Sequence, residues 1–206
     1  VLLIDNWHGF FRQETVRKAV GTFKPDVLGV SNSTAADTNR VLALAKQIRQ
    51  YNPNLLMIIG GQAATVRARE CLTAGFDIVI RGEGEFTFKE LIERTESGSR
   101  DFSDIAGIAY CCGGIFCQTA KRPLIENLDN LPFPAWELMP RFRSNFFPNT
   151  CVSVIESSRG CPFHCNFCAV QSFWERSYRK KSNERIVAEV EYLTKQLGCQ
   201  QVYFID

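Results

Sequence analysis

The chain has 206 residues, of which 45% are apolar and 22% are charged, and its net charge is +2. This is the composition of an ordinary globular protein with room for one large or two small domains. The near-neutral charge gives no argument for a nucleic-acid partner. The longest apolar runs, such as residues 55–59, are too short to span a bilayer.

The nine cysteines bear on the cellular compartment. An odd number of cysteines without an export signal argues against a disulfide scaffold and favours a reducing environment in which thiols are kept for metal. We therefore expect a cytoplasmic protein. Because the chain opens on Val1 and closes on the strand-like run "QVYFID", we expect it to be a fragment of a longer protein.

Strand and helix patterns alternate through the first half of the chain. Short apolar runs predict buried strands, and apolar positions at a helical period predict the helices between them. The alternation predicts parallel βαβ units in a doubly wound α/β sheet. We expect strands at 1–5, 26–31, 54–61 and 77–85, and helices at 12–22, 37–50 (capped by Asp37), 63–74 and 85–97.

Small or polar residues follow three of these strands, at the edge where parallel α/β sheets bind ligands. Small hydroxyls and glycines let a large ligand approach the backbone closely. Each segment alone would be a tight turn, but the three together predict a site for a large, flat or multi-ring cofactor. The residues are Ser31, Ser33 and Thr34 in the first segment, Gly60 and Gly61 in the second, and Gly82, Glu83 and Gly84 in the third.

The segments "VSNST", "GGQAAT" and "IRGEGE" resemble the cobalamin-binding domain of radical S-adenosylmethionine (radical SAM) enzymes, over residues 1–98. The resemblance implies a flavodoxin-like (Rossmann-like) domain whose first strand and helix precede the run at 1–5. In other cobalamin domains a D-x-H-x-x-G motif supplies a histidine to cobalt. Asp5 and His8 have a different spacing here, so we expect cobalt to be bound without a protein histidine.

A β-hairpin with Gly113 and Gly114 as its turn is predicted within residues 99–118. Three cysteines lie on it, but adjacent residues of a strand point to opposite faces, so we expect no second metal site there. The proline-rich stretch that follows predicts an ordered linker, and its "LDNLPFPAWEL" resembles the connector between cobalamin and radical domains. The expected domain boundaries are 1–118, 119–150 and 151–206.

The last part of the chain predicts a strand at 151–158, a helix from Ser182 to about Leu197 and a strand at 201–206. The helix has apolar side chains on one face, as packing on a sheet requires. This strand–helix–strand unit is the expected start of a parallel barrel. The basic run at 175–185 is either solvated or contacts a ligand carboxylate or an acidic electron donor.

Cys161, Cys165 and Cys168 stand in the spacing C-x3-C-x2-C. A disulfide among them would leave one thiol spare. Zinc would need a fourth ligand, and His164 is the one local candidate in the sequence. A 4Fe–4S cluster is normally held by four thiolates, so three thiolates leave one iron open. The spacing favours such a cluster and leaves zinc as the alternative.

The segment "RGCPFHCNFC" resembles the C-x3-C-x-aromatic-C motif of the radical SAM superfamily, with Phe167 at the aromatic position. The resemblance implies a 4Fe–4S cluster whose open iron binds S-adenosylmethionine, within a partial TIM barrel. Reductive cleavage of S-adenosylmethionine would give a 5′-deoxyadenosyl radical. Phe167 would lie near the adenine and, with Phe163, would shield the cluster. The implied partners are a small-molecule substrate and a reductant such as flavodoxin or ferredoxin.

The activity implied for the parent protein is cobalamin-dependent radical methylation of an unactivated carbon or phosphorus centre. One alternative is radical oxidative cyclisation, as in the anaerobic magnesium-protoporphyrin monomethyl ester cyclases, which the chain also resembles. Another is a cobalamin- or metal-binding module without turnover. We assign no catalytic side chain, because the substrate contacts of this family lie mostly on barrel strands beyond Asp206.

Overall fold

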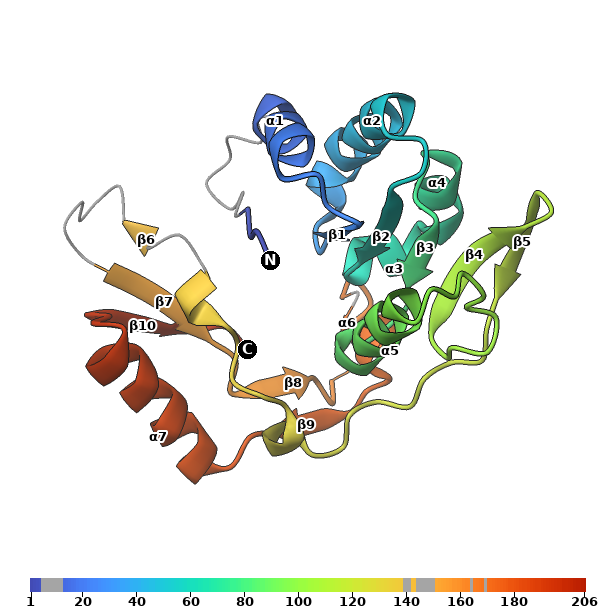
Figure 1. The fold of residues 1–206 in the computed structure, drawn as a ribbon. Coiled ribbons are helices and arrows are strands. Elements are labelled where there is room, and N and C mark those ends of the chain that lie inside the picture. The colour runs from blue at the N-terminus through green and yellow to red at the C-terminus, as the bar shows by residue number, and fades with distance from the viewer. Residues whose placement is uncertain (5–12, 139–141, 144–150, 164, 169) are drawn as a thin grey trace. The chain divides into compact units, whose positions relative to one another are not determined.

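In a computed structural model, the protein has two compact units, Phe11–Leu124 and a second made of Val1–Phe10 with Ile125–Asp206. Each unit has its own sheets and its own apolar core (Figure 1). No helix among the described residues is both long and apolar enough to cross a membrane. The structure describes residues 1–4, 13–138, 142–143, 151–163, 165–168 and 170–206.

The first unit has a five-stranded sheet in the order β1-β2-β3-β4-β5. The first three strands are parallel, and the last two form an antiparallel hairpin that extends the sheet. The strands are β1 Val27–Ser31, β2 Leu56–Gly60, β3 Ile78–Ile80, β4 Ile108–Cys112 and β5 Ile115–Gln118. The helices are α1 Gln13–Phe23, α2 Ala35–Tyr51, α3 Gln62–Val66, α4 Ala68–Thr73 and α5 Glu85–Glu96. The predicted doubly wound α/β fold is confirmed.

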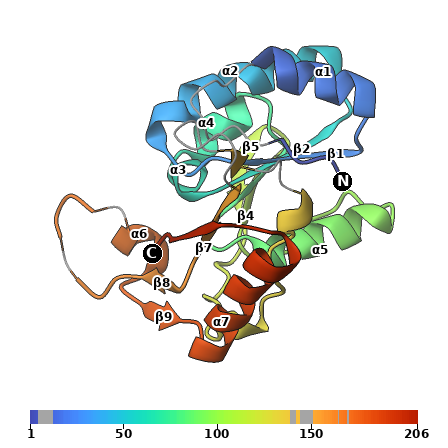
Figure 2. The same ribbon diagram turned by 90° about the vertical axis from the view of Figure 1, so that its left-hand side faces the viewer.

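Helices cover both faces of this sheet (Figure 2). Met57 and Ile59 of β2 belong to the core on the side of α1 to α4, whereas Leu56 and Ile58 belong to the core that includes Leu91 of α5. A strand covered on both faces has no polar side, which explains the unbroken apolar sequence of β2. β1 was expected to be covered in the same way, but it ends the sheet order and is only partly buried.

Two further expectations for the first half were wrong. Val1–Ile4 is exposed and forms no strand, because a strand needs a neighbouring strand to supply hydrogen-bond partners. Helix α2 begins two residues before the Asp37 that was expected to cap it. Thr34 is the N-cap residue, and its hydroxyl donates to the Asp37 carboxylate at 3.0 Å. Asp37 thus lies in the first turn, where the helix dipole favours negative charge.

The expected helix at 63–74 is two short helices, α3 and α4, that meet at Arg67. The predicted hairpin is confirmed. Gly113 and Gly114 both have positive φ, 56° and 81°, which only glycine adopts freely. The exposed Cys111 and Cys112 lie on its first strand.

The second unit contains the predicted strand–helix–strand arrangement. Strand β10 is parallel to β7, and α7 connects them after its N-cap Ser182, whose hydroxyl accepts from the Arg185 N–H at 3.1 Å. Strands β8 and β9 pair separately as an antiparallel ribbon. The elements are the 3-10 turns η1 Leu128–Asn130 and η2 Trp136–Leu138, then β6 Phe142–Arg143, β7 Cys151–Ile155, β8 Ser158–Gly160, α6 Val170–Trp174, β9 Tyr178–Lys180, α7 Asn183–Glu191 with a π-helical end η3 Tyr192–Gln196, and β10 Gln201–Phe204.

A buried ion-pair cluster lies between β9 and α7. Glu189 is fully buried, and both of its carboxylate oxygens accept from the Lys181 ammonium, at 2.7 and 2.8 Å. Arg185 donates to the same carboxylate at 2.7 Å, and Arg179 donates to the Ile125 carbonyl at 2.6 Å. Part of the basic run at 175–185 therefore serves the fold of this unit, which corrects the expectation that the run is simply solvated or contacts a ligand.

Candidate functional site

The ends of β1 and β2 are joined through Asn32. Ser31 pairs with Gly60 in the parallel ladder, and the next backbone N–H, that of Asn32, donates to the Gly60 carbonyl at 2.8 Å. The Asn32 side chain is buried and donates to the Thr38 hydroxyl at 3.0 Å, in the first turn of α2. This residue fixes the turn that presents the exposed Ser33 and Thr34.

The ends of β2 and β3 are joined through Thr65. Its hydroxyl donates to the Gly61 carbonyl at 3.0 Å and accepts from the Gly82 N–H at 3.2 Å. The structure thus brings the three predicted segments to one edge of the sheet. We did not anticipate the linking roles of Asn32 and Thr65. The available signal was a polar side chain just after an apolar strand or in the short helix that follows one.

The glycines at this edge differ in the space that a side chain would have. Gly61 has a φ of 101°, and a Cβ atom there would lie 2.5 Å from the Asn32 carbonyl oxygen, so close packing of the chain excludes a side chain. A Cβ atom on Gly60 or on Gly84 would meet only Ile80, at 3.5 Å. A Cβ atom on Gly82 would meet nothing within 4 Å.

The edge is therefore open to a large ligand at Gly82, whereas the backbone of Asn32 fills the space beside Gly61. The open side at Gly82 and the exposed side chains of Ser33 and Thr34 fit the predicted cobalamin surface. Gly61 supports that surface through the packing of its backbone. Glu83 is buried in the turn after β3.

The three motif cysteines differ in exposure. Cys161 and Cys168 are half-buried, and Cys165 is exposed. The Cys168 N–H donates to the Cys165 carbonyl at 3.1 Å, which closes a tight turn between them. Among the described residues, no three His, Cys, Asp or Glu side chains are grouped as a metal site. The donor chemistry of three thiols in one short loop fits an iron–sulfur cluster, and that assignment rests on their spacing. His164, the alternative zinc ligand, lies outside the described residues.

The approach to the motif is anchored on two sides. The Asp206 carboxylate, just after β10, accepts from the N–H groups of Ser157 and Ser158 at 2.7 and 2.9 Å and from the Ser157 hydroxyl at 2.5 Å. Partial burial acts to raise the pKa of Asp206, but these hydrogen bonds outweigh it and lower the pKa. Gly160 has a φ of 87°, and a Cβ atom there would overlap the Ser177 carbonyl. The segment 157–160 is therefore held in place immediately before Cys161.

The aromatic residues of the motif are on the surface of their unit. Phe163 is 69% exposed and Phe167 is 91% exposed. Side chains so exposed are free to cover a bound group, and their role in shielding a cluster or contacting adenine stays a prediction.

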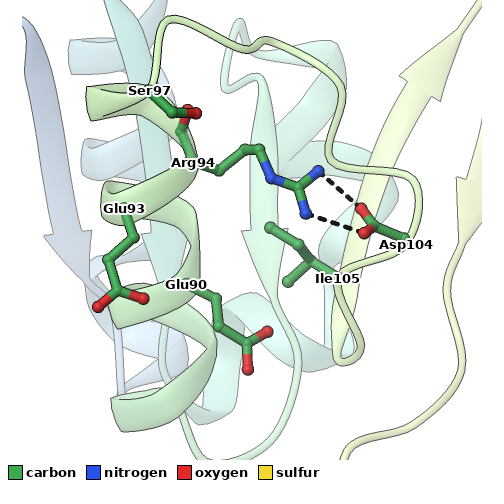
Figure 3. Close-up of a pocket in the computed structure, with 6 residues that line it drawn as sticks. All are labelled: Glu90, Glu93, Arg94, Ser97, Asp104 and Ile105. Carbon is green, nitrogen blue, oxygen red and sulfur yellow. Dashed lines mark hydrogen bonds and ion pairs between the residues drawn. The ribbon is translucent and has the colours of Figure 1, made fainter.

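A shallow surface pocket of about 300 Å³ lies elsewhere in the first unit (Figure 3). Its main charges are already paired, since the guanidinium of Arg94 donates to both oxygens of Asp104 at 2.8 and 2.9 Å. Helix α5 begins after the carboxyl end of β3 and runs back, so the pocket at the end of α5 lies at the opposite sheet edge from the strand-end segments. We assign no site to it. It is lined by Glu90, Glu93, Arg94, Ser97, Asp104 and Ile105.

Comparison with known proteins agrees with this geometry. Residues 4–92 match the family model described as the B12 binding domain. The chain is 34% identical over 214 residues to the uncharacterized methyltransferase PH0819 of Pyrococcus horikoshii, a match that covers 100% of this chain and 45% of the relative. It is 32% identical over 204 residues to the anaerobic magnesium-protoporphyrin IX monomethyl ester cyclase of Rubrivivax gelatinosus, covering 95% of this chain and 36% of the relative.

The fold is also that of a solved structure. The radical S-adenosylmethionine methyltransferase TsrM from Kitasatospora setae, with cobalamin and a [4Fe-4S] cluster bound, matches with a TM-score of 0.68 and 18% sequence identity. The match covers 95% of this chain and 40% of that chain. At this identity the similarity shows the fold. The chain thus spans less than half the length of the proteins described here.

The chain thus combines a B12-binding α/β domain with a β/α frame that carries a C-x3-C-x2-C loop, the arrangement expected from the resemblance to cobalamin-binding radical SAM proteins. The chain contains a B12-binding domain, and the predicted class of radical SAM proteins with a cobalamin-binding domain agrees with the proteins that it is similar to. The predicted cofactors, namely cobalamin, a 4Fe–4S cluster and S-adenosylmethionine, agree with that family.

Proposed function

We propose that the parent protein is a cobalamin-dependent radical SAM methyltransferase acting on an unactivated carbon or phosphorus centre. The observation that carries the proposal is the three-cysteine loop in a β/α frame, in one chain with a B12-binding domain. When bound, the cluster supplies the electron that cleaves S-adenosylmethionine, and cobalamin supplies a carrier for the methyl group.

The residues of this chain then have distinct tasks. Cys161, Cys165 and Cys168 would hold the 4Fe–4S cluster through their thiolates, and an iron without a cysteine ligand would be available to bind S-adenosylmethionine. Asp206 fixes the segment that enters the loop, through its hydrogen bonds to Ser157 and Ser158. The exposed Phe167 covers the adenine side of the loop by apolar contact.

The strand-end edge of the first unit holds cobalamin in this proposal. The exposed side chains of Ser33 and Thr34 contact the polar periphery of the ligand, and the open side at Gly82 admits its ring system. Ser31, Gly60, Glu83 and Gly84 complete the same edge. The thiol loop and this edge thus bind different cofactors through different chemistry.

Methylation is favoured over cyclisation by the 34% identity to a protein named a methyltransferase. Oxidative cyclisation is the second candidate, and the 32% identity to a cyclase supports it. In either case the partners are a small-molecule substrate and a low-potential reductant such as flavodoxin or ferredoxin, in the cytoplasm. A binding module without turnover is the third outcome that an experiment can separate.

Cluster binding is tested by anaerobic reconstitution of the full-length protein followed by iron and sulfide analysis. We expect about four irons and four sulfides per chain, with loss of both in the Cys161→Ala/Cys165→Ala/Cys168→Ala variant. The exposed Cys111, which lies outside the motif, supplies the matched control Cys111→Ala. Stoichiometric zinc without sulfide would contradict the proposal.

Activity is tested by adding dithionite and S-adenosylmethionine to the reconstituted protein with candidate substrates. Formation of 5′-deoxyadenosine with consumption of methylcobalamin is the expected result. A ring product without methyl transfer would identify a cyclase. Absence of 5′-deoxyadenosine from a protein that holds its full cluster would identify a binding module.

A further inference from the structure

Two cysteines outside the motif lie against each other in the second unit. Cys151 is the first residue of β7 and Cys199 precedes β10, and their sulfur atoms are 3.1 Å apart. The paired strands hold them there, because the Gln200 N–H donates to the Cys151 carbonyl at 2.9 Å. The Gln200 side chain in turn accepts from the Cys151 N–H at 3.0 Å. A disulfide bond is about 2.05 Å long, so a small adjustment of the side chains brings the sulfurs to bonding distance.

The surroundings of the two thiols differ in a way that suits stepwise oxidation. Cys199 is buried in the core with Ile155 and Leu193, whereas Cys151 is half-buried at the edge of that core. Cys151 is therefore the thiol that an oxidant in solution reaches first, and Cys199 lies beside it as the resolving thiol.

We propose that Cys151 and Cys199 form a reversible intrachain disulfide. The Cys151 thiolate attacks one sulfur of a low-molecular-weight disulfide such as oxidised glutathione and releases one glutathione thiolate. The Cys199 thiolate then attacks the sulfur of Cys151 in the mixed disulfide and releases the second. The two protein thiols lose two protons and two electrons, and the glutathione disulfide is reduced to two thiols.

The position of the pair separates it from the proposed cluster. The two thiols lie at the amino ends of the parallel strands, whereas the motif follows the carboxyl end of β7, where Ile155 pairs with Phe204. The disulfide would leave Cys161, Cys165 and Cys168 in place. It would join residues 48 positions apart and so tie β7 to β10 across the whole segment that contains the motif. Such a cross-link limits the unfolded chain and stabilises the oxidised form.

The test is a redox titration of the anaerobically purified full chain in glutathione buffers. Free thiols are trapped with N-ethylmaleimide, and the digest is analysed by mass spectrometry. We expect a Cys151–Cys199 cross-linked peptide to accumulate towards one per chain as the buffer becomes more oxidising, and to disappear with dithiothreitol. We also expect the oxidised chain to melt several degrees higher than the reduced chain.

The variants Cys151→Ser and Cys199→Ser should lose the cross-link and the melting shift, while Cys111→Ser should keep both. Both thiols remaining alkylated in strongly oxidising buffer, or stable glutathionylation of Cys151 without a cross-link, would overturn the proposal. If a variant fails to fold, the peptide map of the unsubstituted chain decides alone. Iron and sulfide content is a separate readout, because Cys151→Ser should not change it.

Discussion

The Asp206 carboxylate accepts a hydrogen bond from the backbone N–H of Ser157 at 2.7 Å. The residue after β10 thereby holds the segment after β7, at the point where the chain turns towards the motif cysteines. Two neighbouring parallel strands thus share one anchor at their carboxyl ends. A residue distant in sequence from the motif fixes where the motif begins.

Replacing Asp206 by Ala should loosen this segment. The variant leaves the N–H groups of Ser157 and Ser158 without their acceptor, and a lost hydrogen bond to a charged group costs about 1.5–3 kcal/mol, less where water can replace it. We expect faster hydrogen exchange at these two amides. Asp206→Asn should lie between the variant and the unsubstituted chain, since it keeps one acceptor oxygen. Unchanged exchange in Asp206→Ala would refute the anchor.

The same anchor predicts a pH dependence. The pKa of Asp206 is lowered, and a free aspartate titrates at about 3.9. Because the folded-state pKa is the lower one, the stabilisation is complete above the unfolded value and is lost as the pH falls through the folded value. An NMR titration of the carboxyl carbon should show the low pKa, and Ser157→Ala should raise it towards 3.9. Asp104, whose pKa is lowered by Arg94, should not respond to that substitution.

The buried ion pair of Lys181 and Glu189 predicts that the losses of unfolding free energy in the two single variants do not add up in the double variant. Lys181→Met should destabilise the unit by about 1.5–3 kcal/mol, because it removes both Lys181 hydrogen bonds to the fully buried Glu189 carboxylate and leaves it paired with Arg185. Lys181→Met/Glu189→Leu should cost clearly less than the sum of the two single changes. The exposed pair of Lys195 and Glu191 in the same segment is the control, and Lys195→Met should cost less than about 1 kcal/mol. Urea unfolding measures all of these, and additivity in the double variant would contradict the expectation.

Two neighbouring glycines should respond differently to alanine. Gly61→Ala should destabilise the first unit by about 1–3 kcal/mol, since it combines a positive φ with a Cβ atom 2.5 Å from the Asn32 carbonyl oxygen. Gly60→Ala should be tolerated, because its Cβ atom would meet only Ile80 at an ordinary distance of 3.5 Å. Thermal melting of both variants is the measurement. Equal melting temperatures would show that the turn relaxes around the added methyl group.

The cobalamin surface is tested best at Ser33, whose exposed side chain can be enlarged without disturbing the core. Ser33→Trp in the full-length protein should abolish retention of cobalamin, measured by its visible absorbance after gel filtration, and should leave the melting temperature of the apo form unchanged. Gln50→Trp is the matched control, because it is an exposed position near the end of α2, at the opposite edge of the sheet. Equal retention in both variants would place the ligand elsewhere.

The sequence predicted those elements best whose apolar residues recur at the spacing of a strand or a helix, and those turns and caps that depend on neighbouring residues. The alternation of apolar runs and helical periods predicted β2, β3, α2 and α5. A strand covered on both faces needs a continuous apolar run, and a helix packed on a sheet needs one apolar face. The Gly113-Gly114 turn and the Ser182 N-cap were predictable for a similar reason, since each depends on residues adjacent in the chain.

Features that depend on distant partners were not predictable. The run Val1–Ile4 is as apolar as a buried strand, but apolarity does not supply a strand partner. Gly61 looked like a ligand-facing glycine, and only the close approach of Asn32 reveals its packing role. Lys181 and Glu189 belong to the types most often found in water, and their burial follows from a contact across eight residues and two elements. The anchor at Asp206 spans 49 residues.

The insertion of the cysteine loop between β7 and α7 has a consequence for the order of assembly. β7 and β10 pair directly, through Ile155 and Phe204 at one end and Val152 and Gln201 at the other. Pairing of β7 with β10 closes a long loop, and the chain entropy lost on closure makes this pairing slow relative to local helix formation. The contacts that stabilise the closed loop come from α7 and the apolar core, which does not include the motif cysteines Cys161, Cys165 and Cys168. We therefore expect the frame to fold first and iron delivery to follow, onto a loop whose two ends are already in place.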